Sequence, residues 1–263
     1  SSECAISYKD DTKSEIVLQN MNRQLSLIVQ ASLSHSGITK LYIYSPSFLN
    51  NLCGFPLNIR NKRSSASLIL CDSMLWCAPS FIEKNTLKIQ IQCREFGSRW
   101  QKEKIDCTAV GIASTIFLPT SNESIFVPIN ASVNKATTPF DHTTVITFSP
   151  SLVVRNELRH AITLNPYIEP NNFGITIRQG EEKPIPYSTN DSRFILRLEG
   201  QTKTVNIILA SPTRKVFRIE HAIIEMETVH IKGCLLVHFR KARMPTPMVF
   251  CNLLKIPFSV YQT

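Results

Sequence analysis

Hydrophobic residues alternate with polar ones over short windows of this chain, and the windows are rich in β-branched side chains. The clearest window is Thr86–Cys93, where Leu, Ile, Ile and Cys take one face and Lys, Gln and Gln take the other. A period of two predicts a strand that packs inward on one side and meets water on the other. Similar windows lie at residues 15–18, 25–33, 38–44, 57–59, 67–70, 75–77, 109–112, 115–118, 124–129, 145–148, 162–164, 175–178, 194–198, 205–209, 217–221 and 235–239.

Helical periodicity is nearly absent from the sequence. Residues 222–230 could form one short helix, but Thr228 and Val229 favour a strand there. A length of 263 residues with 43% hydrophobic residues is enough for substantial cores. The short windows therefore predict an all-β chain with more than one core.

One short phrase occurs three times in the chain. It contains a Pro, four or five residues, an Asn, and then an apolar-x-apolar pair, and its copies occupy residues 45–59, 149–164 and 245–260. The Asn residues are Asn51, Asn156 and Asn252, separated by 105 and 96 positions. The middle copy has one extra residue between Pro and Asn, and Ala161 replaces the second Pro of the other copies. A landmark at a near-constant interval predicts a repeated module.

This phrase, preceded by an apolar strand and Ser-Pro or Thr-Pro, resembles the repeats of the adaptor-binding (VAB) domain of the vacuolar protein sorting 13 family. Members of that family are bridge-like lipid transfer proteins of membrane contact sites. Their domain has six tandem β-rich repeats, each with one characteristic Asn. The resemblance covers residues from about 39 to the end, and the segment before it fits the tail of a preceding repeat.

Landmark and resemblance together predict tandem β-sandwich-like modules of about 100 residues each. We expect residues 1–38 to be the closing strands of a preceding repeat and residues 39–140 to be the first complete module. Residues 141–243 are then a second complete module, and residues 244–263 begin a further repeat. The Pro-containing loop at residues 135–139 is the expected boundary between the complete modules.

The repeated Asn allows two interpretations. A short amide that follows a strand-ending Pro can bond to neighbouring backbone and hold a corner of each module, which is a structural clamp. Alternatively, Asn51, Asn156 and Asn252 are presented to a bound adaptor. We favour the clamp, because one turn-forming residue recurs between two strands in every module. A buried amide without partners costs about 1 to 3 kcal/mol, so replacement of the Asn would loosen the module and abolish binding indirectly.

The net charge of +9 lies in four basic clusters between the predicted strands, at residues 60–63, 94–104, 214–218 and 240–243. We interpret them mainly as solvated turns, with acidic partners or anionic lipid head groups as alternatives. Nucleic acid is not expected, because stacking aromatics are not interleaved with the basic residues.

No run of about 18 apolar residues occurs, which excludes a membrane-spanning helix. Ser1–Cys4 reads as the start of an excised fragment rather than a signal peptide.

The eight cysteines do not recur with the repeat, which argues against a disulfide in each module. We expect free thiols that act as small apolar residues. Cys-x-x-Cys is absent and the His residues lack metal-ligand spacing, so neither a metal site nor a cofactor is predicted. The triplets that begin at Asn122, Asn130 and Asn190 match a glycosylation pattern and leave open a secreted or cell-surface tandem of immunoglobulin-like sandwiches.

Catalytic signatures are lacking, so the chain is not expected to be an enzyme. Cys234, His230 and Glu227 could be named as a triad, but no nucleophile motif surrounds them. The resemblance instead implies capture of Pro-x-Pro segments of organelle adaptors, with further repeats and a lipid channel in the same full-length chain. It also implies peripheral, adaptor-mediated recruitment to Golgi, endosome or ER contacts on the cytoplasmic side. The Cys and Ser content indicates an animal protein. The sequence pattern does not identify the paralogue, and the Golgi-associated B type is our working hypothesis.

The chain also carries Pro-x-Pro strings of its own, at Pro184 and Pro245. We interpret both as loop features rather than as built-in ligands. The sequence does not indicate which strand or which joint between modules forms the peptide groove.

Overall fold

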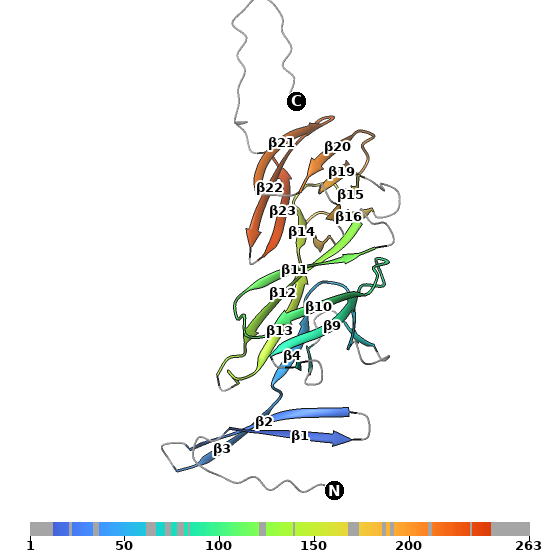
Figure 1. Ribbon diagram of the computed structural model, residues 1–263. Helices are drawn as coiled ribbons and strands as arrows, with labels where there is room; N and C mark the ends of the chain where they lie inside the picture. The colour runs from blue at the N-terminus through green and yellow to red at the C-terminus, as the bar shows by residue number, and fades with distance from the viewer. Residues whose placement is uncertain are drawn as a thin grey trace, which may run out of the picture.

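The computed structural model describes residues 13–20, 23–33, 37–61, 67–71, 75–77, 82–83, 85–120, 125–138, 140–167, 174–185, 188–189, 192–209, 212–231 and 233–242. Every regular element in these ranges is a strand, which confirms the predicted all-β class. The described residues therefore include no helix long and apolar enough to cross a membrane. Figure 1 shows the strands as three groups that follow one another along the molecule, from β1 near the N-terminus to β23.

The first eleven strands are β1 Lys13–Asn20, β2 Arg23–Leu33, β3 Thr39–Tyr44, β4 Ser47–Asn51, β5 Leu57–Arg60, β6 Leu68–Leu70, β7 Leu75–Cys77, β8 Ile82–Glu83, β9 Thr86–Gln92, β10 Gln101–Asp106 and β11 Ala113–Pro119. The remaining strands are β12 Ile125–Lys135, β13 Thr144–Pro150, β14 Leu152–Asn156, β15 Ile162–Pro166, β16 Ile175–Ile177, β17 Glu182–Pro184, β18 Ser188–Thr189, β19 Arg193–Leu198, β20 Thr204–Ile208, β21 Thr213–Ile219, β22 Ala222–Ile231 and β23 Cys234–Lys241.

Two pairs of sheets have the same strand order. The first pair runs β11-β12-β13-β4-β7 and β10-β9-β5-β6, and the second runs β21-β22-β23-β14-β17 and β20-β19-β15-β16. In both, the landmark strand pairs in parallel with the last strand of the group, β4 with β13 and β14 with β23. The structure thus contains two copies of one topology, which we call the first and second sandwich.

The three strands before the first sandwich form a separate sheet, β1-β2-β3. Its antiparallel order and its position before a landmark strand match β11-β12-β13 and β21-β22-β23. The sheet β1-β2-β3 thus has the same pairing as the last three strands of each sandwich.

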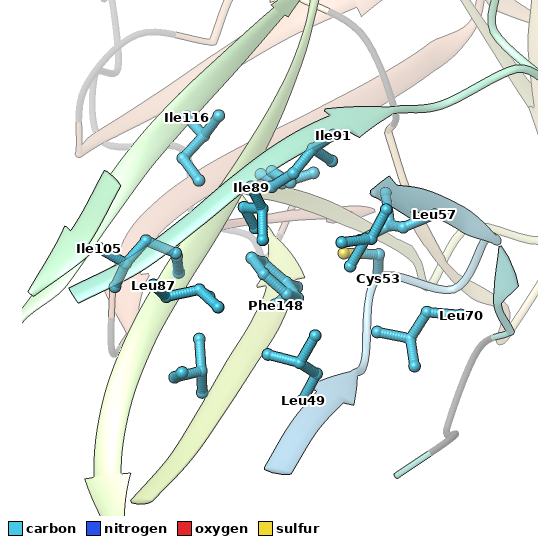
Figure 2. Packing of buried hydrophobic residues seen from close by; sticks show 14 of the residues in the cluster. Leu49, Cys53, Leu57, Leu70, Leu87, Ile89, Ile91, Ile105, Ile116 and Phe148 are labelled. Carbon is cyan, nitrogen blue, oxygen red and sulfur yellow. The ribbon is translucent and has the colours of Figure 1, made fainter. Parts of the chain in front are cut away.

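Each sandwich is filled from both of its sheets. The first core joins Leu49, Phe148 and their neighbours in one sheet to Leu57, Leu87 and their neighbours in the other, and these side chains are fully buried. Figure 2 shows Phe148 in the middle of this cluster, with Leu87, Leu49 and Cys53 around it. The second core has Phe239 among its fully buried side chains and draws likewise on both of its sheets.

The predicted alternation holds in both sandwiches. In β9, Leu87, Ile89 and Ile91 are buried while Lys88 is exposed. In β19, residues 194, 196 and 198 are buried and the two Arg side chains are exposed. Residues 222–231 form strand β22, as Thr228 and Val229 indicated.

Two local predictions are wrong. Residues 109–112 form turns instead of a strand, because Asp106 accepts hydrogen bonds from the backbone and hydroxyl of Thr108 and Gly111 has φ +81°. Residues 182–184, predicted as part of a loop, form edge strand β17, which pairs with β14. Pro184 is tolerated there because an edge strand needs few of its own N–H groups for pairing.

Strand β13 lies on the other side of the predicted division at residue 140. It pairs with β12 and β4, and its Phe148 and Ile146 belong to the first core. The Lys135–Pro139 loop therefore leads into a strand of the same sheet. The division of the chain into modules stays a prediction.

Candidate functional site

Asn51 ends the first landmark strand and lies in the first core with no exposed surface. Its Nδ2 donates to the backbone carbonyls of Phe55 at 2.8 Å and Leu70 at 2.9 Å. Its Oδ1 accepts from the backbone N–H of Cys53 at 3.0 Å. Since Leu70 belongs to β6 in the opposite sheet, this one amide joins the two sheets of the sandwich.

Asn156 repeats this geometry in the second sandwich. Its Nδ2 donates to the carbonyls of His160 and Ile177, both at 2.9 Å, and its Oδ1 accepts from the N–H of Leu158 at 2.9 Å. The bonds run to positions i+4 and i+2, and to the last residue of the strand in the opposite sheet, as at Asn51. Asn156 is also fully buried.

Each amide therefore donates two hydrogen bonds and accepts one within the fold, and neither side chain is accessible to a ligand in this structure. The third landmark residue, Asn252, lies outside the described residues.

The adjoining backbone is repeated as well. The residue after each Asn, Leu52 or Glu157, donates its N–H to the carbonyl of Phe148 or Phe239 at 2.7 and 2.8 Å. This bond extends the parallel ladder by one residue beyond the landmark strand. Each landmark is thus fixed by both its backbone and its side chain.

The first and second sandwich meet along β12. Its residues 125–126 pair with β18, and Ile125 lies in the second core while Val127 and Ile129 lie in the first. A further contact joins β12 to the tip of the β22–β23 hairpin. Asn130 of β12 donates a hydrogen bond from Nδ2 to the carbonyl of Gly233 at the tip, at 2.7 Å.

The turn after the first landmark also lies against the second sandwich. A Cβ built on Gly54 would stand 2.6 Å from Cγ of Pro184, so the absent side chain makes room for the proline ring. Gly54 has φ +80°, a conformation that favours glycine. Sequence reasoning missed this contact, since the two residues lie 130 positions apart.

A cavity of about 590 Å³ lies at the far end of the second sandwich. Leu158 and His160 from the landmark turn line it, together with Leu198 and the start of β22 at Ala222 and Ile223. Ala242, the last residue described, lines it too. Most of the wall is apolar, which suits a side-chain docking surface better than a site for a charged small molecule.

A buried carboxylate sits between β21 and β23. Glu225 has only 1% exposed side-chain surface, and its Oε1 lies 2.7 Å from both Arg240 Nη2 and Arg214 Nε. Hydrogen bonds from Arg240 and then from Arg214 hold the pKa of Glu225 below its ordinary value of 4.5, although burial acts to raise it. Strand pairing places Glu225 opposite Arg240 and Asn130 opposite Ser149, at equivalent positions of the two sandwiches.

The predicted basic clusters are partly used within the fold. Arg214 and Arg240 pair with Glu225, and the Arg60 guanidinium stacks 4.1 Å from the Trp100 ring centre. Arg94 and Arg99 are exposed. Residues 62, 63 and 243 of these clusters lie outside the described ranges.

Three of the cysteines lie inside the first core. Cys53 and Cys93 are fully buried free thiols, and Cys107 is nearly so, whereas Cys71 is exposed. Burial raises the pKa of Cys93 to about 12. These thiols pack as small apolar groups, as expected.

Of the three residues that could be named as a triad, Cys234 is not activated as a nucleophile. Burial and then the nearby Glu182 raise the pKa of Cys234 to about 11, so it stays a thiol at neutral pH. Glu227 pairs with Arg240 at 2.9 Å, and His230 is exposed. Among the described residues, no group of three or more His, Cys, Asp or Glu side chains could hold a metal ion.

Asn130 begins one of the three glycosylation-type triplets. Its exposed surface is 2%, and its Oδ1 accepts a hydrogen bond from Thr115 Oγ1. A glycan at this side chain would require the joint between the sandwiches to open. Asn122 and Asn190 lie outside the described residues.

A comparison with protein families matches residues 3–263 to the adaptor-binding domain of vacuolar-sorting associated protein 13. A comparison with curated proteins gave no match. The family match spans both sandwiches, the preceding sheet and the third landmark, so the resemblance that the repeated phrase indicated extends over nearly the whole sequence. The chain belongs to the vacuolar-sorting associated protein 13 adaptor-binding domain family.

Proposed function

We propose that this chain is a non-catalytic interaction module that captures short Pro-x-Pro segments of adaptor proteins. Membership of an adaptor-binding domain family supports the protein-interaction role. The preference for Pro-x-Pro rests on the resemblance of the repeats and on the geometry of the sheet edges.

The edges of the sheets offer places for such a segment to bind. Among the strands that the structure describes, β11 and β21 each lie at the end of a sheet and are 7 residues long. An extended peptide can add to an edge of this length through main-chain hydrogen bonds, while its alternate side chains find pockets.

Pro-x-Pro suits this mode of binding. In a strand, residues i and i+2 direct their backbone groups to one edge and residue i+1 directs its groups to the other. The prolines of the motif can therefore face away from the sheet, where their missing N–H groups are not needed, while the central residue bonds to it. Proline also stiffens the free peptide, which lowers the entropy lost on binding.

The test is binding of adaptor-derived Pro-x-Pro peptides to the intact multi-repeat domain, with Ala-x-Ala peptides of otherwise equal sequence as controls. We expect association of the Pro-x-Pro peptides and slower amide exchange in β11 or β21 when they bind. No association by any peptide of the array would contradict the proposal.

We further propose that Asn51 and Asn156 are structural clamps and that Asn252 has the same role in a third module. Support comes from their complete burial and from the three equivalent hydrogen bonds at the first two. Replacement of a clamp then weakens adaptor binding through the fold of the module rather than through a lost contact.

The division of the chain into repeats is part of the same proposal. Residues 1–38 close a preceding repeat, residues 39–140 and 141–243 form complete modules, and residues 244–263 open another. The strand pairing supports a unit of this length but favours boundaries near Ser45 and Ser151, because β3 and β13 pair with the strands before them.

Recruitment by adaptors would place a bridge-like lipid transfer protein at organelle membranes from the cytoplasmic side. Golgi, endosome and ER contacts remain the proposed locations, and the Golgi-associated B type remains the proposed paralogue. Microscopy of the tagged full-length protein, with and without the candidate adaptor in the cell, tests this. A location that does not depend on any Pro-x-Pro adaptor would contradict it.

A further inference from the structure

We propose that the cavity at the far end of the second sandwich is a joint that receives the following repeat module, the one that the third landmark opens. This proposal rests on the proposed division into repeats but not on peptide capture, since it concerns how one module packs on the next.

The joint between the first and second sandwich shows how one end of a module contacts the module that follows it. There, the landmark turn at Gly54 receives Pro184, residues 125–126 of β12 pair with β18, and the carbonyl of Pro128 accepts from Ser151 Oγ at 3.1 Å. The receiving groups belong to the first sandwich, and the groups that cover them come from the segment after it, at Ser151, Pro184 and β18.

The cavity occupies the equivalent end of the second sandwich. Asn156 aligns with Asn51, so Arg159 stands where Gly54 stands, and His160 where Phe55 stands. Strand pairing aligns β22 with β12, which places Ile223 at the position of Pro128 and His221 at that of Phe126. Arg159, His160, His221 and Ile223 all line the cavity.

The two ends differ in a way that explains the cavity. Strand β12 extends beyond its pairing with β13, and residues 125–126 pair with β18 there, whereas β21 and β22 are joined by a two-residue turn at Glu220 and His221. Glu220 has φ +49°, and its carboxylate accepts from the backbone of Thr202 at 3.1 Å and of Lys203 at 3.3 Å. The turn is thus tied to its own sandwich, so the next module meets apolar side chains instead of a strand.

The course of the chain agrees with this occupant. Ala242 lines the cavity, and the Pro-x-Pro of the third landmark begins only three residues later, at Pro245. A following module therefore starts at the rim of the surface that it has to cover. In addition, Ile223 leaves 38% of its surface exposed in the wall, which a docked module would bury.

The experiment compares three variants of the full-length protein. Ile223→Glu introduces a charge into the cavity wall, and Ile223→Ser is a milder change at the same position. Val229→Glu is the matched control, since Val229 is 43% exposed on the same strand but does not line the cavity. Readouts are trypsin cleavage at Lys241 and Arg243 and amide exchange at residues 157–160, with exchange in β23 as a measure of the fold.

We expect Ile223→Glu to increase cleavage and exchange at the joint by about tenfold, and Ile223→Ser to have a smaller effect in the same direction. Val229→Glu should match the parent protein, and β23 should stay protected in Ile223→Ser. Equal cleavage in all three variants overturns the proposal. So does protection of residues 157–160 that arises only when a Pro-x-Pro peptide is added, because the cavity is then a peptide site.

Discussion

The two sandwiches are alike at the landmark corner and different at the end that meets the next repeat. At the corner, Asn51 and Asn156 make the same three bonds with lengths that agree within 0.1 Å. Gly54 and Asn130 of the first sandwich contact the second one, whereas the equivalent residues of the second sandwich are Arg159 and Glu225.

The comparison separates two demands on a repeat. The corner joins the sheets within one module, so every module needs it in the same form. The far end has to fit one particular neighbour, and its residues can differ from module to module.

The largest effect is expected from the corner. Asn51→Ala or Asn156→Ala leaves two carbonyls and one N–H without their side-chain partner, at about 1 to 3 kcal/mol for each buried group. We expect a loss of about 3 kcal/mol or more in the unfolding free energy of the affected sandwich, and a further loss for Asn→Asp, whose oxygens cannot donate to the carbonyls. Chemical denaturation with amide exchange measures it for each sandwich.

The control for this substitution is Asn50→Ala, the neighbouring residue on β4, whose side chain is half-buried. It should cost less than about 1 kcal/mol. If the Asn50 and Asn51 substitutions cost the same, the clamp is not what stabilises the corner.

A smaller effect is expected at the joint. Gly54→Ala places a Cβ where Pro184 Cγ lies 2.6 Å away, in a backbone conformation of φ +80° that alanine rarely adopts. We expect a loss of about 1 to 3 kcal/mol, seen as faster amide exchange in β17 and β18. Arg159→Gly, at the equivalent position of the second sandwich, should leave β17 and β18 unchanged, and an equal effect would remove the proposed difference between the ends.

Acid should act on the second sandwich through Glu225. Because the pKa of this carboxyl is lowered in the folded state, its contribution is fully present above its ordinary pKa of 4.5 and is lost as pH falls through the folded-state value. Glu225→Gln should therefore reduce stability at pH 7 and flatten the acid side of the stability profile. Thermal unfolding between pH 3 and pH 7 checks this, and an unchanged slope in the variant would contradict the assignment.

The smallest effect is expected for Asn130→Ala. The substitution removes the bonds of Nδ2 to the carbonyls of Gly233 and Pro150 and the acceptor of Thr115 Oγ1. Thr115 and Gly233 are exposed, so water can replace their lost partner. A loss of about 0.5 to 1.5 kcal/mol is expected, seen at β11 and at the β22–β23 hairpin. Exchange rates at the hairpin tip measure it, and a loss as large as that for Asn51→Ala would mean that the joint, not the corner, limits stability.

Local pattern was sufficient for the fold class and for most strands. Period-two alternation identified β9 and β19 because each has one face in a core and one in water. It failed at residues 109–112, where apolar residues occur in a turn that the Asp106 side chain and Gly111 impose. A short apolar run does not reveal such side-chain-to-backbone bonds.

The repeated phrase identified the Asn positions, but it did not predict the contacts between the two sandwiches. Asn130 bonds to Gly233, 103 positions away, and neither residue belongs to the repeated phrase. The burial of Glu225 could not be predicted either. Alternation along β22 places only the neighbours of Glu225 in the core, and it does not show that residues of β21 and β23 cover the Glu225 carboxylate. Contacts of this kind depend on how whole modules pack on one another. The local pattern of a single sequence does not predict that packing.

Strand β12 has a mechanical consequence for the molecule. One continuous backbone carries Ile125 into the second core and Val127 and Ile129 into the first. A change in the angle between the two sandwiches would therefore have to bend β12 at residues 125–129 and disturb both cores.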